Sequence, residues 1–320
     1  MDATSVVRRF PAGQPYESVI SRCATLPAEE AVRILVVGAT GFIGSYLVRC
    51  LGGLGHEVEG WGRRAAAPDF LPDYRSLDLT DPSAFHGLEG GWDAAYLLSA
   101  HSVPGAVWTG EMVLENLGMT GRFLEFINRT CPGCRVVVGS SALVYGPADH
   151  KLTERDPRNP GGLYGLSKAM TEDWAQFAAQ SLDIQIARVF NQVGVGMPKG
   201  LLATDALEKI RSRESAVSFN GSDTTRDYLD VRDGVEALAH LAGIQAPSGS
   251  IWNICSGKGC SVSDLGRILM EELHVEKPLQ FGRGNPDKLV GDPSKLKMAT
   301  GWAPRHSLRD ALGQLVDSTR

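Results

Sequence analysis

The stretch that decides the fold reads VRILVVGATGFIG and runs from Val32 to Gly44. Its first half is a short run rich in β-branched residues and apolar from Ile34 to Val37, which is typical of a strand buried on both faces of a parallel sheet. Apolar residues at helical spacing follow from Phe42 to Leu54. The sequence therefore predicts a strand, a glycine-rich turn and a helix in immediate succession.

Three glycines occupy the predicted turn with the spacing GxxGxxG instead of the more common GxGxxG. Glycines at such a turn let the backbone approach a pyrophosphate closely and let the helix pack on the strand. The free N–H groups and the positive dipole end of the helix then face the phosphates. Glycines that serve packing alone are the alternative. We predict a dinucleotide site made by Gly38, Thr40, Gly41, Phe42, Ile43 and Gly44.

The end of the second predicted strand, near residues 58–61, indicates which dinucleotide binds. An acidic residue there would bind the ribose 2′-hydroxyl of NAD, but the expected position is Gly62, and Arg63 and Arg64 follow it. An arginine can hold a 2′-phosphate through two parallel hydrogen bonds. The sequence thus favours NADP(H), with NAD as the alternative cofactor and two merely solvated arginines as the alternative role. Glu59 is expected to point away by strand alternation.

Strands and helices alternate beyond this unit. Further strands are predicted near residues 94–98, 135–139 and 184–190, and helices near 112–128 and 164–181. This alternation predicts an α/β fold, a Rossmann-like doubly wound parallel sheet with right-handed crossovers. The regularity weakens after Asn191, which predicts a smaller C-terminal lobe. The expected division is an extension over 1–30, the dinucleotide domain over 31–190 with about 234–254, and the second lobe over 191–233 and 255–320; segments 235–241 and 250–254 are expected to return to the sheet.

Composition excludes several classes of protein. The net charge is −5, from 32 basic and 37 acidic residues, so no basic field is present that would attract nucleic acid. No apolar run approaches the roughly 20 residues that cross a bilayer, and no apolar segment follows Arg8 and Arg9 as in a secretion signal. Six cysteines without dense spacing fit a reducing compartment. We therefore expect a cytoplasmic protein with no nucleic-acid or membrane partner.

Tyr164 and Lys168 are four residues apart on a predicted helix, hence on one face. The reference pKa of tyrosine is about 10, and a neighbouring ammonium is expected to lower it. The phenol could then exchange a proton with a sugar hydroxyl as hydride moves. Ser141 ends the strand RVVVG at the ligand-binding edge of such a sheet, where it could hydrogen-bond the substrate oxygen. For the tyrosine and lysine alone, the alternative is a pair of residues on the surface of a helix with no catalytic role.

Together these motifs resemble the extended short-chain dehydrogenase/reductase family of nucleotide-sugar enzymes, over a match from Val32 to the C-terminus. Within it, strings such as residues 190–194 (FNQVG) and 226–233 (RDYLDVRD) are similar to the GDP-4-keto-6-deoxy-mannose reductase and GDP-mannose dehydratase branch. The resemblance implies that Ser141, Tyr164 and Lys168 are the catalytic set. It also implies further contacts, with Asp78, Leu79, Leu98, Ser99, Ala100 and Asn116 on the cofactor side and Ser102 (in the string Ser102-Val103), Ser141, Asn191, Arg226 and Arg283 on the substrate side.

The sequence departs from this branch at several positions. Dehydratases carry an acid just after the catalytic serine or threonine, whereas Ala142 and Leu143 stand here, so dehydration lacks its general acid. His101 replaces a Gln or Lys of the branch, as a substrate contact or a different packing choice. Asp287 is off register as a ribose ligand. Lys199 could contact a phosphate or simply be solvated.

One further motif, CPGC at residues 131–134, has no second CxxC or histidine pair at zinc spacing, so we interpret it as a structural turn and expect no metal. The function predicted is an NADP(H)-dependent 4-ketoreductase of a nucleotide-diphosphate sugar, GDP favoured. The alternative is a nucleotide-sugar epimerase with tightly bound NAD(P), which uses the same residues. A 4,6-dehydratase and a non-catalytic cofactor-sensing protein are less favoured. The family further implies a homodimer through the helices at 112–128 and 164–181.

Overall fold

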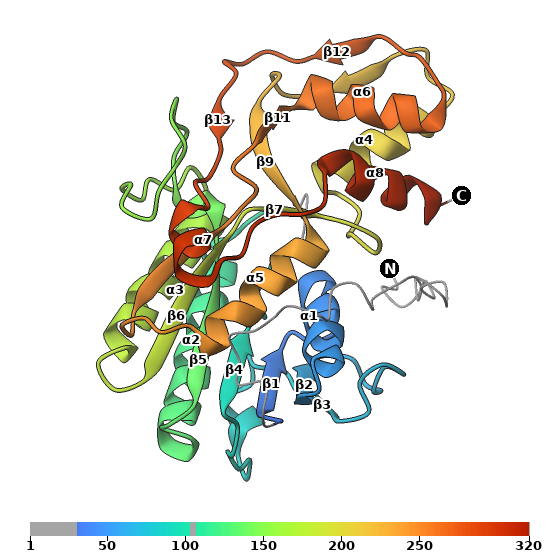
Figure 1. The fold of residues 1–320 in the computed structure, drawn as a ribbon. Coiled ribbons are helices and arrows are strands. Elements are labelled where there is room, and N and C mark those ends of the chain that lie inside the picture. Colours follow the sequence, from blue (N-terminus) through green and yellow to red (C-terminus); the bar gives the residue numbers. More distant parts are fainter. Residues whose placement is uncertain (1–30, 103–106, 320) are drawn as a thin grey trace.

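The computed structural model describes residues 31–102 and 107–319 (Figure 1). The predicted extension over residues 1–30 and the valine of the Ser102-Val103 string lie outside the described residues. Two groups of strands organise the chain: one large sheet built mainly by the first 190 residues, and smaller sheets that lie above it in Figure 1.

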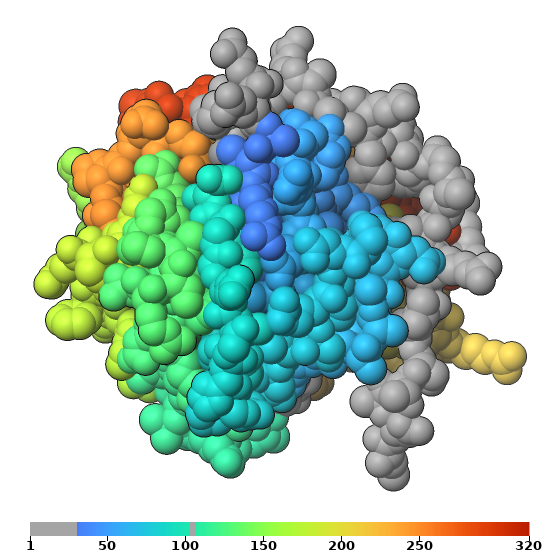
Figure 2. Space-filling model, turned by 90° about the horizontal axis from the view of Figure 1, so that it is seen from below, coloured from blue at the N-terminus to red at the C-terminus, as the bar shows by residue number. Residues whose placement is uncertain are grey.

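The large sheet contains seven strands in the order β10-β6-β5-β4-β1-β2-β3, and every neighbouring pair is parallel. Seen from below (Figure 2), the dark blue segment of β1 lies between the lighter blue of β2 and β3 and the cyan of β4. The order reverses at β1, and ligands bind at such a switch point, outside the carboxyl ends of the strands. The strands are β1 (Arg33–Val37), β2 (Glu57–Gly62), β3 (Tyr74–Ser76), β4 (Ala94–Leu97), β5 (Arg135–Ser141), β6 (Asp183–Val189) and β10 (Ser250–Ile254).

Helices cover both faces of this sheet, which explains why β1 is apolar from Ile34 to Val37. Ile34 and Val36 pack with α1 (Phe42–Gly53) and α5 (Val231–Gly243) on one face. Leu35 and Val37 pack with α2 (Gly110–Thr130) and α3 (Leu163–Ala178) on the other. All four side chains are fully buried, and burial of each contributes about 1.5–3 kcal/mol. The predicted doubly wound fold is therefore confirmed.

A second lobe contains the shorter strands and has a separate apolar core that includes Leu207, Leu265 and Leu312. Its strands are β7 (Asn191–Val193), β8 (Val217–Phe219), β9 (Thr225–Asp230), β11 (Gly259–Ser261), β12 (Leu279–Phe281) and β13 (Lys288–Leu289). Its helices are α4 (Leu202–Arg211), α6 (Val262–Leu273) and α8 (Leu308–Asp317), while α7 (Ser294–Thr300) packs against β10. The described residues also form two 3-10 turns, η3 (Pro82–Phe85) and η4 (Ala142–Val144).

The observed elements differ from the predicted ones in two places. The segment at residues 235–241, expected to return to the sheet, is a helix, α5, that packs on the sheet's face. The strand β3 was not predicted because its three residues are partly or fully exposed and carry no apolar pattern. It joins only β2, at the edge of the sheet.

Candidate active site

The glycine turn between β1 and α1 has the geometry of a phosphate cradle. Gly38 has φ 90, a conformation that L side chains rarely adopt. A Cβ on Gly44 would lie 2.1 Å from the Gly38 carbonyl oxygen, so only glycine fits. Within the described residues 31–102 and 107–319, no side chain caps the first turn of α1, whose N-cap residue is Gly41. The helix N–H groups are thus free to bind an anion.

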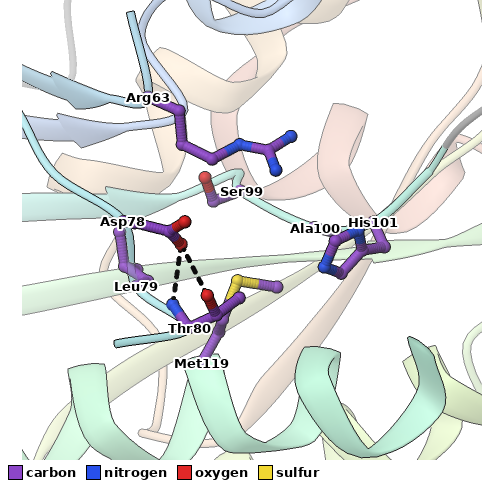
Figure 3. Close-up of a pocket in the computed structure, with 8 residues that line it drawn as sticks. All are labelled: Arg63, Asp78, Leu79, Thr80, Ser99, Ala100, His101 and Met119. Carbon is purple, nitrogen blue, oxygen red and sulfur yellow. Dashed lines mark hydrogen bonds between the residues drawn. The ribbon is translucent and has the colours of Figure 1, made fainter. Parts of the chain in front are cut away.

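A hollow lies next to this turn, because one of its lining residues, Ser99, has its amide nitrogen 2.9 Å from where a Cβ on Gly38 would stand. Arg63 extends over Ser99 from the end of β2, and Met119 reaches it from α2 (Figure 3). Asp78 accepts hydrogen bonds from the Thr80 amide at 3.0 Å and the Thr80 hydroxyl at 2.8 Å. Five of the lining residues were predicted cofactor contacts: Arg63, Asp78, Leu79, Ser99 and Ala100; the others are Thr80, His101 and Met119.

At the end of β2, where NAD enzymes carry an acidic residue, this chain has Arg63 and Arg64. A Cβ on Gly62 would lie 2.9 Å from the Thr40 hydroxyl and 3.1 Å from the Tyr74 hydroxyl, so these two side chains fill the space of a carboxylate. The Arg63 guanidinium helps to lower the pKa of Asp78, after the hydrogen bond from the Thr80 amide. Arg64 is exposed on the same loop.

Glu59 points away from the hollow, as strand alternation predicts. It accepts hydrogen bonds from the indoles of Trp61 and Trp92, at 2.8 and 3.0 Å, and pairs with Arg33. Leu98, another predicted cofactor contact, does not line the hollow; its amide continues the sheet by donating to the Val37 carbonyl at 2.9 Å.

The three predicted catalytic residues come together where β5 ends and α3 begins. Ser141 is the last residue of β5, and Tyr164 and Lys168 lie on one face of α3. The Ser141 hydroxyl lies near the Tyr164 phenol and opposes the rise in its pKa, and the Tyr164 ring packs against Trp108 with centroids 5.2 Å apart. The Lys168 ammonium donates to the Gly139 carbonyl at 2.8 Å.

The expectation that Lys168 lowers the pKa of Tyr164 is wrong in this structure. Burial raises the pKa of the Tyr164 phenol, and only the hydrogen bond with Ser141 opposes this change. Burial also lowers the pKa of Lys168 to about 8, against an opposing effect of Glu172. The phenol is therefore protonated at neutral pH, and the site holds a proton donor.

Comparison with known proteins agrees with this geometry. The family described as "NAD dependent epimerase/dehydratase family" matches residues 34–255. The chain belongs to this family.

Two curated relatives and one solved structure show its breadth. GDP-6-deoxy-D-mannose reductase of Pseudomonas aeruginosa is 26% identical, over 89% of this chain and 96% of that protein. UDP-glucose 4-epimerase of Azospirillum brasilense is 28% identical, over 88% of this chain and 89% of that protein. The structure of MoeE5 in complex with UDP-glucuronic acid and NAD is 28% identical with a TM-score of 0.80, over 90% of this chain and 99% of that one. The predicted class, an enzyme of the extended short-chain dehydrogenase type, is confirmed.

Asn116 is buried and has its amide fully engaged by the protein. Its oxygen accepts from the His101 amide at 2.6 Å, and its nitrogen donates to the His101 carbonyl at 3.2 Å and the Ser167 hydroxyl at 3.1 Å. Asn116 thereby links the loop after β4 to α3 at Ser167, the residue before Lys168. The imidazole of His101 lies 2.7 Å from the carboxylate of Glu115.

The predicted substrate contacts of this family member are more dispersed. Asn191 and Arg226 lie on the paired strands β7 and β9, and the Asn191 amide donates to the Asp227 carbonyl at 2.9 Å. Arg226 forms an ion pair with Asp287 at 2.6 Å. Lys199 forms an ion pair with Glu208 at 2.6 Å. Ser102 and Arg283 are exposed. Their contact with a substrate stays a prediction.

Three other expectations can be compared with the described part of the chain. The CPGC segment forms a turn, in which the Cys134 amide donates to the Cys131 carbonyl at 2.9 Å, and burial raises the pKa of the Cys134 thiol. Within residues 31–102 and 107–319, no cluster of three or more His, Cys, Asp or Glu side chains could hold a metal. None of the helices described there is long and apolar enough to cross a membrane.

Proposed function

We propose that the protein is an NADP(H)-dependent nucleotide-sugar 4-ketoreductase, with a GDP-linked sugar as the favoured substrate. The observation that carries this proposal is the Tyr164 phenol near the end of β5, where α3 packs on η4 and the residues after Ser141 are the hydrocarbon Ala142 and Leu143. Reduction of a ketone needs one proton donor at its oxygen, which Tyr164 supplies. Dehydration needs a second acid next to Ser141, and both side chains there are hydrocarbon. The similarity to GDP-6-deoxy-D-mannose reductase supports the same direction.

The residues present divide the reaction as follows. Bound NADPH would supply the hydride to carbon 4 of the sugar. Tyr164 gives its phenolic proton to the carbonyl oxygen, which becomes a hydroxyl, and the phenolate then regains a proton from solvent. The Ser141 oxygen accepts from the Leu143 amide at 3.2 Å, and its hydroxyl proton can turn to the substrate oxygen. Lys168 holds the nicotinamide ribose, and the second lobe holds the nucleotide.

The second candidate is an epimerase, favoured by the 28% identity to UDP-glucose 4-epimerase of Azospirillum brasilense. The two functions differ in what happens to the cofactor. A reductase exchanges its dinucleotide on every turnover, whereas an epimerase retains it so that the hydride can return. Denaturing the purified protein and identifying the released dinucleotide separates them. We expect an empty or exchangeable site that consumes NADPH with a GDP-linked 4-keto sugar; stoichiometric, tightly held oxidised cofactor would reject the reductase.

Replacing Arg63 and Arg64 together by alanine is expected to raise the KM for NADPH about 10- to 100-fold and to leave that for NADH nearly unchanged. A hydrogen bond to a charged group contributes about 1.5–3 kcal/mol, and only NADPH carries the 2′-phosphate. Steady-state kinetics with both dinucleotides measure the effect. Arg267→Ala removes an arginine from a surface ion pair with Asp264 and is the matched control. Equal changes for both dinucleotides would contradict 2′-phosphate recognition.

A homodimer is part of the same proposal, formed by the outer faces of α2 and α3. Leu114 on α2 and Phe177 on α3 are 66% and 71% exposed. The Trp174 indole lies across the seam between the helices, 3.1 Å from where a Gly121 Cβ would stand. Sedimentation should find a dimer for the native protein and a monomer for Phe177→Asp. Met298→Asp changes an equally exposed apolar residue, 82% exposed on α7, and should remain dimeric. A native monomer would reject the dimer.

A further inference from the structure

A buried carboxylate lies one helical turn beyond Lys168 on the same face of α3. This residue, Glu172, is only 1% exposed, and neither catalysis nor the predicted contacts account for it. A buried charge is costly unless it is paired and fully hydrogen-bonded. The partners of Glu172 therefore indicate what the carboxylate does.

Two adjacent strands of the large sheet hold this carboxylate. The Ser140 hydroxyl donates to Glu172 Oε1 at 2.6 Å. The Arg188 guanidinium donates to both oxygens, at 2.9 Å from Nε and 2.7 Å from Nη2. Ser140 and Arg188 are register partners on β5 and β6. Such two-pronged arginine–carboxylate pairs fix orientation as well as position, so Glu172 is held in place from the sheet.

The end of β5 thus contacts α3 at three successive turns. The Ser141 side chain lies near the Tyr164 phenol, the Gly139 carbonyl accepts from Lys168, and Ser140 donates to Glu172. Because the three helix residues are spaced by four, they share one face. Glu172 connects this face of α3 to the sheet through its ion pair with Arg188.

The carboxylate also acts on Lys168 electrostatically. Burial lowers the pKa of Lys168 to about 8, and the negative charge of Glu172 raises it against that effect. The other titratable groups of the surroundings are Tyr164 on α3, Arg188 on β6, Arg158, whose Nη1 lies 3.6 Å from Glu172 Oε2, and Tyr145, whose ring lies 4.5 Å from the Arg188 guanidinium. The adjoining α2 presents a neutral amide, Asn116. Glu172 is therefore the group that favours the charged form of the lysine.

We infer that Glu172 is a positioning residue of the active site: held by Ser140 and Arg188, it keeps the Lys168 ammonium charged and aligned with Tyr164 for contact with the dinucleotide ribose. This rests on the proposed role of Lys168 toward a dinucleotide and is independent of the sugar. A lysine without this support would lose its proton near neutral pH and hold the cofactor less well.

The test is the pH dependence of dinucleotide binding, measured by fluorescence titration with NADPH in a Tyr164→Phe background so that the phenol does not titrate. Affinity should fall as pH rises through about 8, the pKa of Lys168. Glu172→Gln removes the charge and nearly preserves the shape. We expect the midpoint to move about one pH unit lower, which weakens binding about fivefold at pH 8. Glu271→Gln on α6 removes an exposed carboxylate paired with Arg309 and should not move the midpoint.

Loss of Glu172 leaves Arg188 buried and unpaired, so a Glu172→Gln/Arg188→Gln variant is measured in parallel, with thermal unfolding of each protein. An unchanged midpoint in a folded variant overturns the inference, and so does failure of both variants to fold, which would make Glu172 purely structural. If the midpoint shifts but the native protein, with Tyr164 intact, does not reduce keto sugars, the role of Glu172 is upheld and only the proposed function is rejected. Turnover without a shifted midpoint does the reverse.

Discussion

Tyr164→Phe is expected to lower turnover by about 10²- to 10⁴-fold, the usual contribution of a general acid or base, while dinucleotide affinity changes little. The substitution removes only the phenolic oxygen, which lies near Ser141 and carries the proton. The ring that packs against Trp108 at 5.2 Å remains, so the local structure is preserved. Initial rates with a keto sugar and fluorescence titration of NADPH measure the two effects separately.

The matched control is Tyr228→Phe, which removes a hydroxyl from a tyrosine buried in the core of the second lobe. Its turnover should stay close to that of the native protein. If Tyr164→Phe kept more than about a tenth of native turnover, below the range for a general acid, another group would have to deliver the proton. Unchanged cofactor binding with no measurable turnover in the native protein would favour a cofactor-sensing function instead.

The parts of the fold that could be predicted from the sequence are those that bury a continuous pattern. The strands β1 and β5 and the helices α1, α2 and α3 have enough apolar residues, at a clear period, to be recognised. The strands of the second lobe are two to six residues long, too short for a period to emerge. Likewise, α5 is buried along most of its length, and a helix apolar on several sides cannot be told from a strand by periodicity.

The candidate site was predictable where a residue type is itself the signal. Gly38, Gly44, Ser141 and the Tyr164–Lys168 pair belong to motifs whose spacing carries the chemistry. Met119 and Thr80 were missed because nothing in their sequence surroundings marks them; only folding brings α2 and the loop after β3 to the same hollow.

The pKa of Tyr164 was misjudged for a related reason. Sequence spacing places Lys168 on the same helix face but does not tell that its ammonium turns to the Gly139 carbonyl, nor how deeply the phenol is buried. Desolvation then outweighs a charge that points elsewhere. One signal for Glu172 was available, since it continues the four-residue spacing of Tyr164 and Lys168. Its partner Arg188 comes from another strand and could be found only in the structure.

Gly44→Ala is expected to abolish tight dinucleotide binding and to destabilise the protein by about 1–3 kcal/mol, the usual cost of an extra methyl group in a packed site. The added carbon would lie 2.1 Å from the Gly38 oxygen and 3.1 Å from Ala39 Cα, and both are backbone atoms that no rotamer change can move. The turn must therefore open, and the N–H groups of α1 lose their aim at the phosphates. Chemical denaturation and NADPH titration measure the two effects.

Gly52→Ala provides the matched control, because Gly52 lies on the same helix and a Cβ there would meet nothing within 4 Å. An alanine in a helix is about 0.5–1 kcal/mol more favourable than a glycine, so this variant should be slightly more stable and should bind NADPH normally. The two substitutions are chemically identical, and only the close approach of Gly44 to Gly38 separates them. Normal binding by Gly44→Ala would mean that this turn does not hold the cofactor, and the strand–turn–helix motif would no longer indicate a dinucleotide enzyme.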